Sequence, residues 1–520
     1  KLETCKLKLS HYFCRMSNLR VYNSYVRDKE NFVSLVPGHV GMYVCGPTVS
    51  GESHLGHARP YITFDVIFRY LMYLGYKVRY VRNITDAGHF EEEGREAVDK
   101  ISTKAQIEKM EPMELVQKYT NLFHWAMDQF NCLPPSIEPT ATGHIVEQIS
   151  MIEELIKAGY AYEVNGSVYF DVKKYAKGHD YGKLSGRVID DLLETTRELE
   201  GQEEKKDRAD FALWKAAPPE HIMRWKSPWG EGFPGWHIEC SAMSTKYLGK
   251  QFDIHGGGMD LLFPHHESEI AQSTICNHVP PARYWIHNNM ITINGKKMGK
   301  SYNNVIKLTE MFSGDHPMLE KAYSPMTIRF FILQTHYRST LDFSNEALQA
   351  AEKGLKRLME AYEWLKQAEV GGQRSEAGGQ KQEDEGLKKK VASLLNELDD
   401  FINDDFNTAK VMANIFELIP VINSLKDKTI AFEALGADTF NLLKDKLKIF
   451  IEDILGLKQE SAANDDKLKG VMQVLIELRK EARAKKDWAT SDKIRNQLAE
   501  IGIQLKDEKN GNISWSSTSP

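Results

Sequence analysis

The sequence is poor in cysteine, lacks long apolar runs and carries no excess of positive charge, and each shortage excludes a class of protein. Its 520 residues include six cysteines, which are too few and too scattered for a disulfide framework. No apolar run reaches the ~18 residues that a membrane-spanning helix needs. The net charge of −6 gives no general attraction for nucleic acid, so RNA binding would depend on local basic patches. We therefore expect a cytoplasmic chain with reduced thiols and no membrane segment.

The length and several shifts in composition predict more than one domain. We expect an N-terminal extension at 1–17, in which Met16 is a candidate start. Two halves of one α/β domain follow at 18–132 and 234–325, separated by an inserted domain at 133–233. The rest is a helical bundle at 326–460, with a flexible excursion at 368–386, and a small α+β unit at 466–520. The excursion is rich in Gly, Gln and Glu, which is typical of a flexible connection.

The first half of the α/β domain contains a strand–helix–strand pattern. Residues 40–45 are apolar, residues 56–74 carry an apolar stripe with helical spacing, and residues 78–84 are rich in β-branched side chains. This pattern predicts a βαβ unit in a parallel sheet. Ligands of such sheets bind beyond the carboxyl ends of the strands, where Cys45 and the residues after Arg82 fall.

The tract His54-Leu55-Gly56-His57 lies at the expected start of this helix. A helix N-terminus attracts anions, glycine lets a nucleotide approach the backbone, and imidazoles can donate to phosphate oxygens. Taken alone, two surface histidines at a helix cap explain these four residues better, because short motifs often match by chance.

A second tract, Lys297-Met298-Gly299-Lys300-Ser301, lies in a polar loop far downstream. Two lysines in such a loop can neutralise phosphate charge in a transition state. Taken alone, the tract reads as a solvated run of charge. The two tracts together, each after a predicted strand, favour an ATP-dependent enzyme.

Cys45, Cys240, His265 and Glu269 form a candidate metal site. His265 and Glu269 are four residues apart on a predicted helix at 264–273, so both project from one face. Two thiolates, an imidazole and a carboxylate are a suitable set for zinc. Sequence spacing alone does not show that the four residues lie close together. His266 is as good a candidate ligand as His265, and Cys240 could instead be a small buried apolar residue.

Residues 252–260 predict a buried strand that runs into a glycine loop at 256–260. Such loops contact phosphate or ribose, and Asp260 could accept from hydroxyls. A tight turn capped by Asp260 is an equally good interpretation.

The terminal unit is basic around Trp488, although the chain as a whole is acidic. An exposed aromatic beside basic residues can stack unpaired bases and contact RNA phosphates. A solvated basic helix face with Trp488 in a small core is the alternative.

These tracts together resemble class I aminoacyl-tRNA synthetases and, within that class, the cysteinyl-tRNA synthetase family, over nearly the whole chain from about Asn18. The matching tracts occur in the family's order: Met42-Tyr43-Val44-Cys45-Gly46-Pro47-Thr48-Val49, the histidine tract, Tyr80-Val81-Arg82-Asn83-Ile84-Thr85-Asp86, Gly235-Trp236-His237-Ile238-Glu239-Cys240-Ser241-Ala242-Met243, residues 252–260 and 263–272, the lysine tract and Asp487-Trp488-Ala489. The resemblance implies an α/β fold: a Rossmann-type parallel-sheet catalytic domain with an inserted domain, followed by a C-terminal helical bundle and a small anticodon-binding α+β unit.

The resemblance also implies roles for single residues. The histidine tract stands in the family's HIGH motif and the lysine tract in its KMSKS motif, where Gly299 replaces the first serine. The implied residues are, for catalysis, His54, His57, Lys297 and Lys300; for ATP, Gly46, Thr48, His54, Gly56, His57, Gly256, Gly257, Asp260 and Lys300; for cysteine, Cys45, Thr85, Trp236 and His255; for zinc, Cys45, Cys240, His265 and Glu269; and for the tRNA anticodon, Arg483, Trp488, Asp492 and Asp507.

The implied reaction joins L-cysteine and ATP, with Mg²⁺, into cysteinyl-adenylate and then passes the acyl group to tRNA(Cys), by a monomeric enzyme. A zinc ion in the substrate site would select the cysteine thiol, because a coordinated thiol loses its proton whereas a serine hydroxyl is a much poorer ligand. We expect such a site to reject serine by about 10⁴.

Three other functions compete with this interpretation. A cysteine-adenylating small-molecule ligase would share the catalytic half but lack an RNA-reading tail. A zinc hydrolase using His265, His266 and Glu269 would leave the histidine and lysine tracts unexplained. A non-catalytic RNA-binding descendant would not need the motif residues that this sequence retains.

Overall fold

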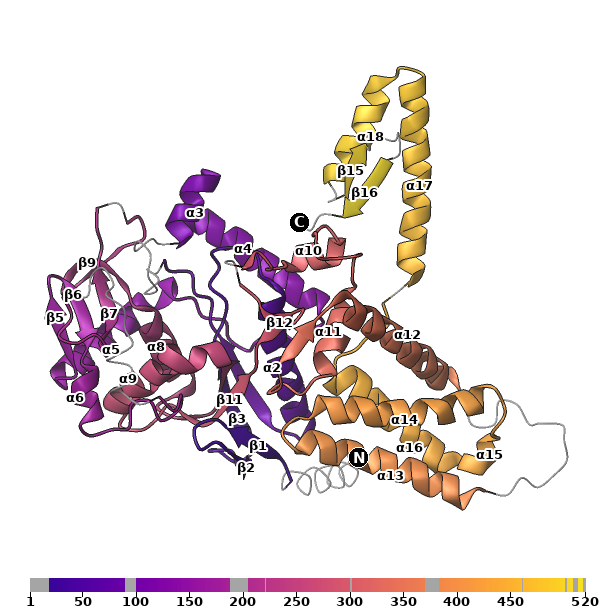
Figure 1. Ribbon diagram of the computed structural model, residues 1–520, viewed down its shortest axis with the longest axis horizontal. Coiled ribbons are helices and arrows are strands. Elements are labelled where there is room, and N and C mark those ends of the chain that lie inside the picture. The colour runs from indigo at the N-terminus through magenta and orange to yellow at the C-terminus, as the bar shows by residue number, and fades with distance from the viewer. Residues whose placement is uncertain are drawn as a thin grey trace, which may run out of the picture.

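The structure is a computed structural model that describes residues 18–88, 100–187, 204–219, 221–299, 302–369, 383–460, 462–500, 503–507 and 513–517. The expected extension at 1–17, Lys300, Ser301 and most of the excursion at 368–386 lie outside these residues. Figure 1 shows three regions around a central sheet: an inserted sheet on the left, a helical bundle at the lower right and a terminal unit at the upper right.

The central sheet is parallel, as the sequence predicts. Its strands are β3 (His39–Val44), β4 (Lys77–Arg82), β10 (Phe252–Gly258) and β11 (Ala282–Asn288), in the order β11-β10-β3-β4. Helix α2 (Leu55–Tyr73) connects β3 to β4 and packs its apolar stripe on the sheet, with Ile62 and Phe64 fully buried. Because all four strands are parallel, their carboxyl ends share one edge, where the candidate site residues lie.

One stretch differs from the sequence prediction. Gly256–Gly258 belong to β10 and pair with β11, whereas a loop was expected. Glycine at 256 leaves room for the ring of Phe64, because a Cβ there would lie 2.2 Å from that ring. The predicted helix at 264–273 corresponds to the helical turn Leu262–His266, which is kinked at the non-helical Phe263, and to α9 (Glu267–Asn277), which continues it. The kink lies directly before residue 264 and so agrees with the predicted start.

The inserted part forms an antiparallel sheet that shares its hydrophobic core with Ile238, Ala242, Ala271 and Ile275 of the segment after it. Its strands are β5 (Ala161–Val164), β6 (Ser167–Phe170), β7 (Phe211–Ala216), β9 (Gly230–Pro234) and β8 (Trp225–Ser227), in that order. Further elements of the described chain up to Phe343 are β1 (Arg20–Asn23), β2 (Asp28–Asn31), α3 (Lys100–Glu108), α4 (Pro112–Gln129), α5 (Ile145–Lys157), α6 (Val172–Ala176), α8 (Trp236–Leu248), β12 (Ile291–Ile293), β13 (Lys296–Lys297), α10 (Leu308–Ser313), α11 (Pro325–Leu333) and β14 (Leu341–Phe343).

After β14 the described chain is helical up to a small terminal unit. The bundle contains α12 (Asn345–Gln367), α13 (Glu385–Asn403), α14 (Thr408–Lys426), α15 (Phe432–Leu435) and α16 (Ala437–Lys448). Ser344, Asp384 and Asn407 cap α12, α13 and α14 through side-chain hydrogen bonds, which fixes where these helices begin. None of the helices in the described ranges is long and apolar enough to cross a membrane.

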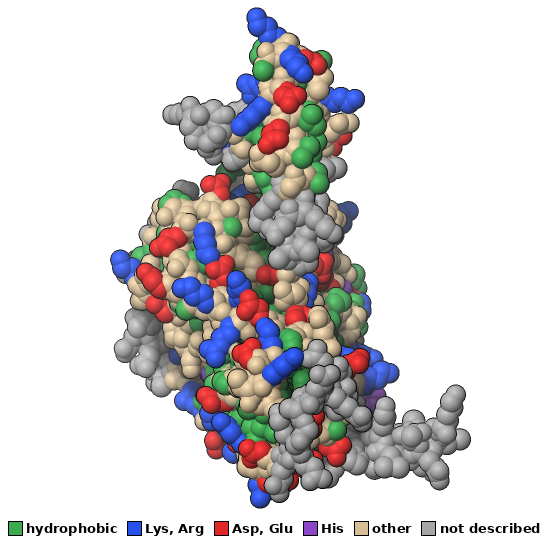
Figure 2. All heavy atoms as spheres, turned by 90° about the vertical axis from the view of Figure 1, so that its right-hand side faces the viewer, with side chains coloured by type: hydrophobic (Ala, Val, Ile, Leu, Met, Phe, Trp, Pro, Cys, Tyr) green, Lys and Arg blue, Asp and Glu red, His purple; other side chains and the backbone are tan. Residues whose placement is uncertain are grey.

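The terminal unit is formed by α17 (Ala462–Ala484), α18 (Trp488–Glu500) and the hairpin β15 (Ile503–Asp507) and β16 (Ile513–Ser517). The sequence predicts a hairpin of residues 503–505 and 513–515 around Asn510-Gly511, and the structure confirms the hairpin, although that turn lies outside the described residues. Figure 2 shows this unit standing above the body with several Lys and Arg side chains on its visible face.

Candidate active site

Four buried side chains from separate parts of the chain meet at the carboxyl edge of the sheet. Cys45 follows β3, Cys240 lies in α8, and His265 and Glu269 flank the start of α9. Their potential ligand atoms all lie within 4.8 Å of one another. The Cys45 Sγ is 4.0 Å from the Cys240 Sγ, and the His265 Nε2 is 3.1 Å from the Glu269 Oε1. The structure therefore shows that the four residues lie close together, which their spacing in the sequence could not show.

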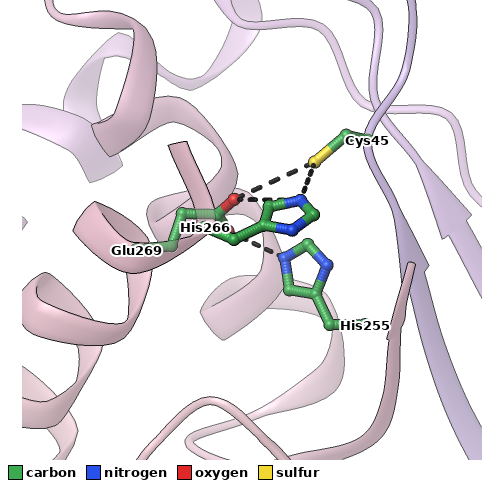
Figure 3. Close-up of side chains that lie close together, drawn as sticks. All are labelled: Cys45, His255, His266 and Glu269. Carbon is green, nitrogen blue, oxygen red and sulfur yellow. Dashed lines mark hydrogen bonds and ion pairs between the residues drawn. The ribbon is translucent and has the colours of Figure 1, made fainter. Parts of the chain in front are cut away.

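A second set of possible ligands shares two of these residues. Cys45 and Glu269 also meet His255 and His266, as Figure 3 shows. The Cys45 Sγ is 3.3 Å from the His266 Nε2, and the His255 Nε2 is 2.9 Å from the Glu269 Oε2. The choice between His265 and His266 as a metal ligand is therefore a choice between two complete sets of ligands.

The histidines of the cluster are held by further buried residues. The His265 Nδ1 lies 2.9 Å from the Nδ1 of His237, so its Nε2 is left to face the thiols and Glu269. The His266 Nδ1 lies 2.8 Å from the Nε2 of His287. Such outer partners fix the orientation and tautomer of a ligand. His237 and His287 were not singled out from the sequence, because contacts between distant residues leave no spacing signal.

The charges of the cluster suit a divalent cation. A hydrogen bond from Cys45 lowers the pKa of Cys240 to about 7 against the effect of burial. Burial lowers the pKa of His265, but the Cys240 thiolate and Glu269 outweigh this effect and raise it to about 10. Burial likewise raises the pKa of Glu269, but His255 and His265 bring it down to about 2. A thiolate and a carboxylate are thus available as anionic ligands.

Three residues expected to bind cysteine surround this cluster. The ring of Trp236 lies 4.4 Å from that of His265 and is partly exposed, and the ring of His255 stacks on Trp285 at 4.4 Å. The Thr85 Oγ1 lies 3.1 Å from a carboxylate oxygen of Glu239. Glu239 is fully buried and was not predicted, although it lies within a matching tract.

The histidine tract lies at the N-terminus of α2. His54 is the N-cap residue, and its ring stacks on that of His57 at 3.9 Å. Burial and the neighbouring His54 ring lower the pKa of His57 to about 3, so this ring is neutral at physiological pH. A neutral imidazole at a helix N-terminus can donate one hydrogen bond to a phosphate oxygen.

The lysine tract lies against the histidine tract. A Cβ on Gly56 would lie 2.6 Å from the Met298 Cε, so the two tracts touch. The Asn304 side chain holds the loop through two hydrogen bonds: it accepts one from the Gly299 N–H and donates one to the Lys297 carbonyl. Lys297 is exposed, and Lys300 lies outside the described residues.

Several of the residues expected to bind ATP line the same edge of the sheet. A Cβ on Gly46 would lie 1.5 Å from the carbonyl oxygen of Asn83, so only glycine fits there. Thr48 is exposed and pairs through its backbone with Thr85. Gly257 is buried in β10, and Asp260 is exposed just beyond it.

The residues expected to face the anticodon lie in the terminal unit. Arg483 at the end of α17 is exposed, and Trp488 at the start of α18 is 57% exposed, so it does not fill a core. Asp492 pairs with Arg495 at 3.2 Å. The side chain of Asp507 lies outside what the structure describes.

The parallel sheet with a histidine tract at a helix N-terminus and a lysine loop against it defines a class I aminoacyl-tRNA synthetase. Residues 31–353 match the family described as the class I (C) tRNA synthetase catalytic domain. In fold, the chain is similar to methionyl-tRNA synthetase from Mycobacterium tuberculosis (TM-score 0.55, 12% identity, covering 80% of this chain and 92% of that one) and to LeuRS from Agrobacterium radiobacter (TM-score 0.54, 12% identity, covering 82% and 85%).

The chain belongs to the cysteine–tRNA ligase family. It is 58% identical to the cysteine–tRNA ligase of Phocaeicola vulgatus, covering 96% of this chain and 99% of the relative, and 57% identical to that of Bacteroides fragilis, covering 96% and 98%. The ligase of Chlorobaculum tepidum is 47% identical, covering 96% and 99%. Residues 399–459 match the DALR domain, and residues 465–513 match the cysteinyl-tRNA ligase anticodon-binding domain.

Proposed function

We propose that this enzyme activates L-cysteine with ATP to cysteinyl-adenylate and transfers the cysteinyl group to tRNA(Cys), with Zn²⁺ selecting the thiol. The observation that carries the proposal is the convergence of two thiols, an imidazole and a carboxylate beside the paired histidine and lysine tracts. A purely apolar pocket separates near-isosteric substrates poorly, whereas a site that needs one substrate group discriminates strongly.

Cys45, Cys240, His265 and Glu269 would hold the zinc. We prefer this set to the one containing His255 and His266, because two thiolates are softer ligands and suit zinc better than one. A Zn²⁺ ion held by these residues would supply Lewis acidity that favours the thiolate form of the substrate sulfur. His237 holds His265 through its Nδ1, and Trp236, Thr85 and His255 line the space in which the amino acid lies.

Activation then depends on position and charge. The cysteine carboxylate attacks the α-phosphorus of ATP, a bond to the pyrophosphate oxygen breaks, and negative charge moves onto the leaving group. His54, His57, Lys297 and Lys300 donate to the phosphate oxygens and stabilise that charge, while Mg²⁺ accompanies the nucleotide. Gly46, Gly56, Gly256 and Gly257 let the nucleotide approach the backbone, and Asp260 accepts from a ribose hydroxyl.

The two C-terminal parts would recognise the RNA. We assign activation to 18–132 and 234–325, and recognition of the tRNA body and anticodon to 326–460 and 466–520. Trp488 would stack on a base, Arg483 would contact phosphate, and Asp492 and Asp507 would accept from base amino groups. All of these residues belong to one chain, so we expect a monomer to be active, in a compartment such as the cytoplasm that keeps its thiols reduced.

A small-molecule ligase is not favoured, because the chain continues past its catalytic half into the DALR and anticodon-binding regions. The test is cysteine-dependent exchange of pyrophosphate into ATP, followed by charging of total tRNA with radiolabelled cysteine. We expect both activities, and the charged species should hybridise to a tRNA(Cys) probe. Exchange without any charging would support a small-molecule ligase instead.

A further inference from the structure

Arg59 lies two residues after His57 on α2, and its guanidinium is buried. It donates to five backbone carbonyls: Nη1 to Asn289 (2.9 Å) and Met290 (2.6 Å), and Nη2 to His336 (3.3 Å), Tyr337 (3.3 Å) and Ser339. Burial lowers the pKa of Arg59 to about 10, so the side chain remains charged at neutral pH. A rigid, planar donor with partners in two loops fixes both loops relative to α2.

The first of these loops leads into the lysine tract. Met290 directly precedes β12, which turns back into β13 and ends at Lys297. The chain that leaves this hairpin also contacts α2, because Met298 packs against Gly56. The residues on both sides of the β12–β13 hairpin are therefore held to the histidine helix, Met290 by Arg59 and Met298 by Gly56.

The second loop, residues 336–339, is held from the opposite side by the helical bundle. Asp405 lies between α13 and α14 and is fully buried. One of its carboxylate oxygens accepts from the Tyr337 hydroxyl at 2.6 Å and from the Tyr22 N–H at 2.8 Å, and the other accepts from the Arg338 Nε at 2.7 Å. Arg59 thus holds the backbone of this loop, and Asp405 holds its side chains.

The backbone at Asp405 has an uncommon conformation. Asp405 and Phe406 have φ values of +66° and +52°, which is the left-handed region that side chains with a Cβ rarely adopt. Phe406 is buried and packs edge-on against Tyr70 of α2. Two consecutive left-handed residues persist only where their surroundings hold them, and such strain concentrates at functional positions.

We propose that Arg59 and Asp405 are positioning residues that couple the helical bundle to the ATP site through the 336–339 loop and the β12–β13 hairpin. This inference rests on the proposed function and adds to it. The bundle holds Asp405, Asp405 holds the loop, Arg59 joins the loop to the hairpin, and the hairpin carries Lys297 to the phosphates. A displacement of about 1 Å at a catalytic group can cost about 10²-fold in rate, so the coupling would act on the ATP step.

The test is cysteine-dependent pyrophosphate exchange by the full chain with Arg59→Lys and Asp405→Asn. Lysine keeps the charge but cannot span five carbonyls, and asparagine keeps the shape but loses the charge. We expect Arg59→Lys to lower kcat/KM for ATP at least about tenfold and Asp405→Asn by about threefold or more, with KM for cysteine changed less than about twofold and the zinc content unchanged. The double variant should lose less than the product of the two separate effects, because the two residues act along one path.

Two controls separate positioning from general destabilisation. Arg69→Lys alters another buried arginine of α2, whose partners are Asp65 and the carbonyls of Asn131 and Asp453. Asp404→Asn removes the neighbouring ion pair with Lys29. Neither control touches the hairpin, so both should keep wild-type ATP kinetics, and denaturant unfolding of every variant reports stability.

A folded Arg59→Lys protein with the ATP kinetics of Arg69→Lys would overturn the inference, as would equal losses for ATP and cysteine. If Arg59→Lys does not fold, Asp405→Asn decides: a selective loss with ATP supports the coupling, and wild-type kinetics reject it. Pyrophosphate exchange by the wild type supports the proposed function whatever the two variants do. A wild type without exchange would reject the proposed function and this inference with it.

Discussion

Gly56 and Met298 lie so close that a Cβ on the glycine would be 2.6 Å from the methionine Cε. Their contact joins the N-terminus of α2 to the loop that contains Lys297. The backbone supports the same contact, because the Leu55 N–H donates to the Ile306 carbonyl and the Leu308 N–H donates to the Ser53 carbonyl. The histidine and lysine tracts are therefore joined in one structural unit.

Replacing Gly56 with alanine should displace the Met298 side chain and press on the His54 ring. The new methyl group would meet the Met298 Cε and, at 3.0 Å, the His54 ring. We expect kcat/KM for ATP in pyrophosphate exchange to fall about tenfold or more, with little change in KM for cysteine. Gly51→Ala is the matched control, since a Cβ there meets nothing within 4 Å. Equal ATP kinetics for the two variants would contradict the close approach.

Metal content distinguishes the two ligand sets. With Cys45, Cys240, His265 and Glu269 as ligands, Cys240→Ala should abolish stoichiometric zinc, whereas His266→Gln, next to the site, should weaken zinc binding by about 10–100-fold at most. Cys276→Ser, outside the cluster, should bind zinc like the wild type. Metal analysis of the purified proteins and competition with a chelator measure these differences. Full zinc content in Cys240→Ala together with its loss in His266→Gln would instead identify the set with His255 and His266.

The low pKa of His57 predicts how its contribution depends on pH. Burial and His54 depress this pKa to about 3, so His57 is neutral both at pH 8 and at pH 5.5 and gains no proton as the pH falls between them. Since kcat/KM reports ionisations of the free enzyme, the ratio of kcat/KM for ATP between the wild type and His57→Asn should stay constant over this range.

A group with an ordinary histidine pKa would give a different profile. The ratio would then change in a step near pH 6.5, where a free imidazole takes up its proton. Such a step would contradict the burial of a neutral His57. The ratio cancels the titration of ATP itself, because both proteins use the same substrate.

Trp488→Ala should affect only the RNA step. Stacking of a base on an aromatic side chain is worth about 1–3 kcal/mol, so KM for tRNA should rise roughly tenfold while pyrophosphate exchange is unchanged. Leu442→Ala, which truncates an exposed side chain of the bundle, is the control and should leave both steps intact. A loss of exchange in Trp488→Ala would mean that this side chain stabilises the fold instead.

The parts of the fold that follow from local patterns were predictable. The apolar stripe of α2 and the β-rich runs on either side gave the parallel βαβ unit, and the paired apolar stretches near the C-terminus gave the β15–β16 hairpin. The predicted glycine loop was wrong, because the close packing of Phe64 against Gly256 involves residues distant in the sequence. The helix predicted at 264–273 followed from local pattern, and it begins after the kink at Phe263 and continues in α9 to Asn277.

The site shows the same division between local and distant information. His265 and Glu269 could be paired by helical spacing, but only the fold brings Cys45 and Cys240 to them. The supporting residues left no signal at all. Arg59 donates hydrogen bonds to backbone carbonyls, which every residue has. No pattern of side chains in the sequence therefore predicts its partners.

The most direct test compares cysteine and serine in pyrophosphate exchange before and after Zn²⁺ is removed. The zinc-loaded enzyme should prefer cysteine by about 10⁴ or more in kcat/KM, and removal of zinc should abolish cysteine-dependent exchange until zinc is restored. A protein shown to be free of metal that still prefers cysteine over serine by the same ratio would contradict selection of the thiol by a metal at Cys45, Cys240, His265 and Glu269.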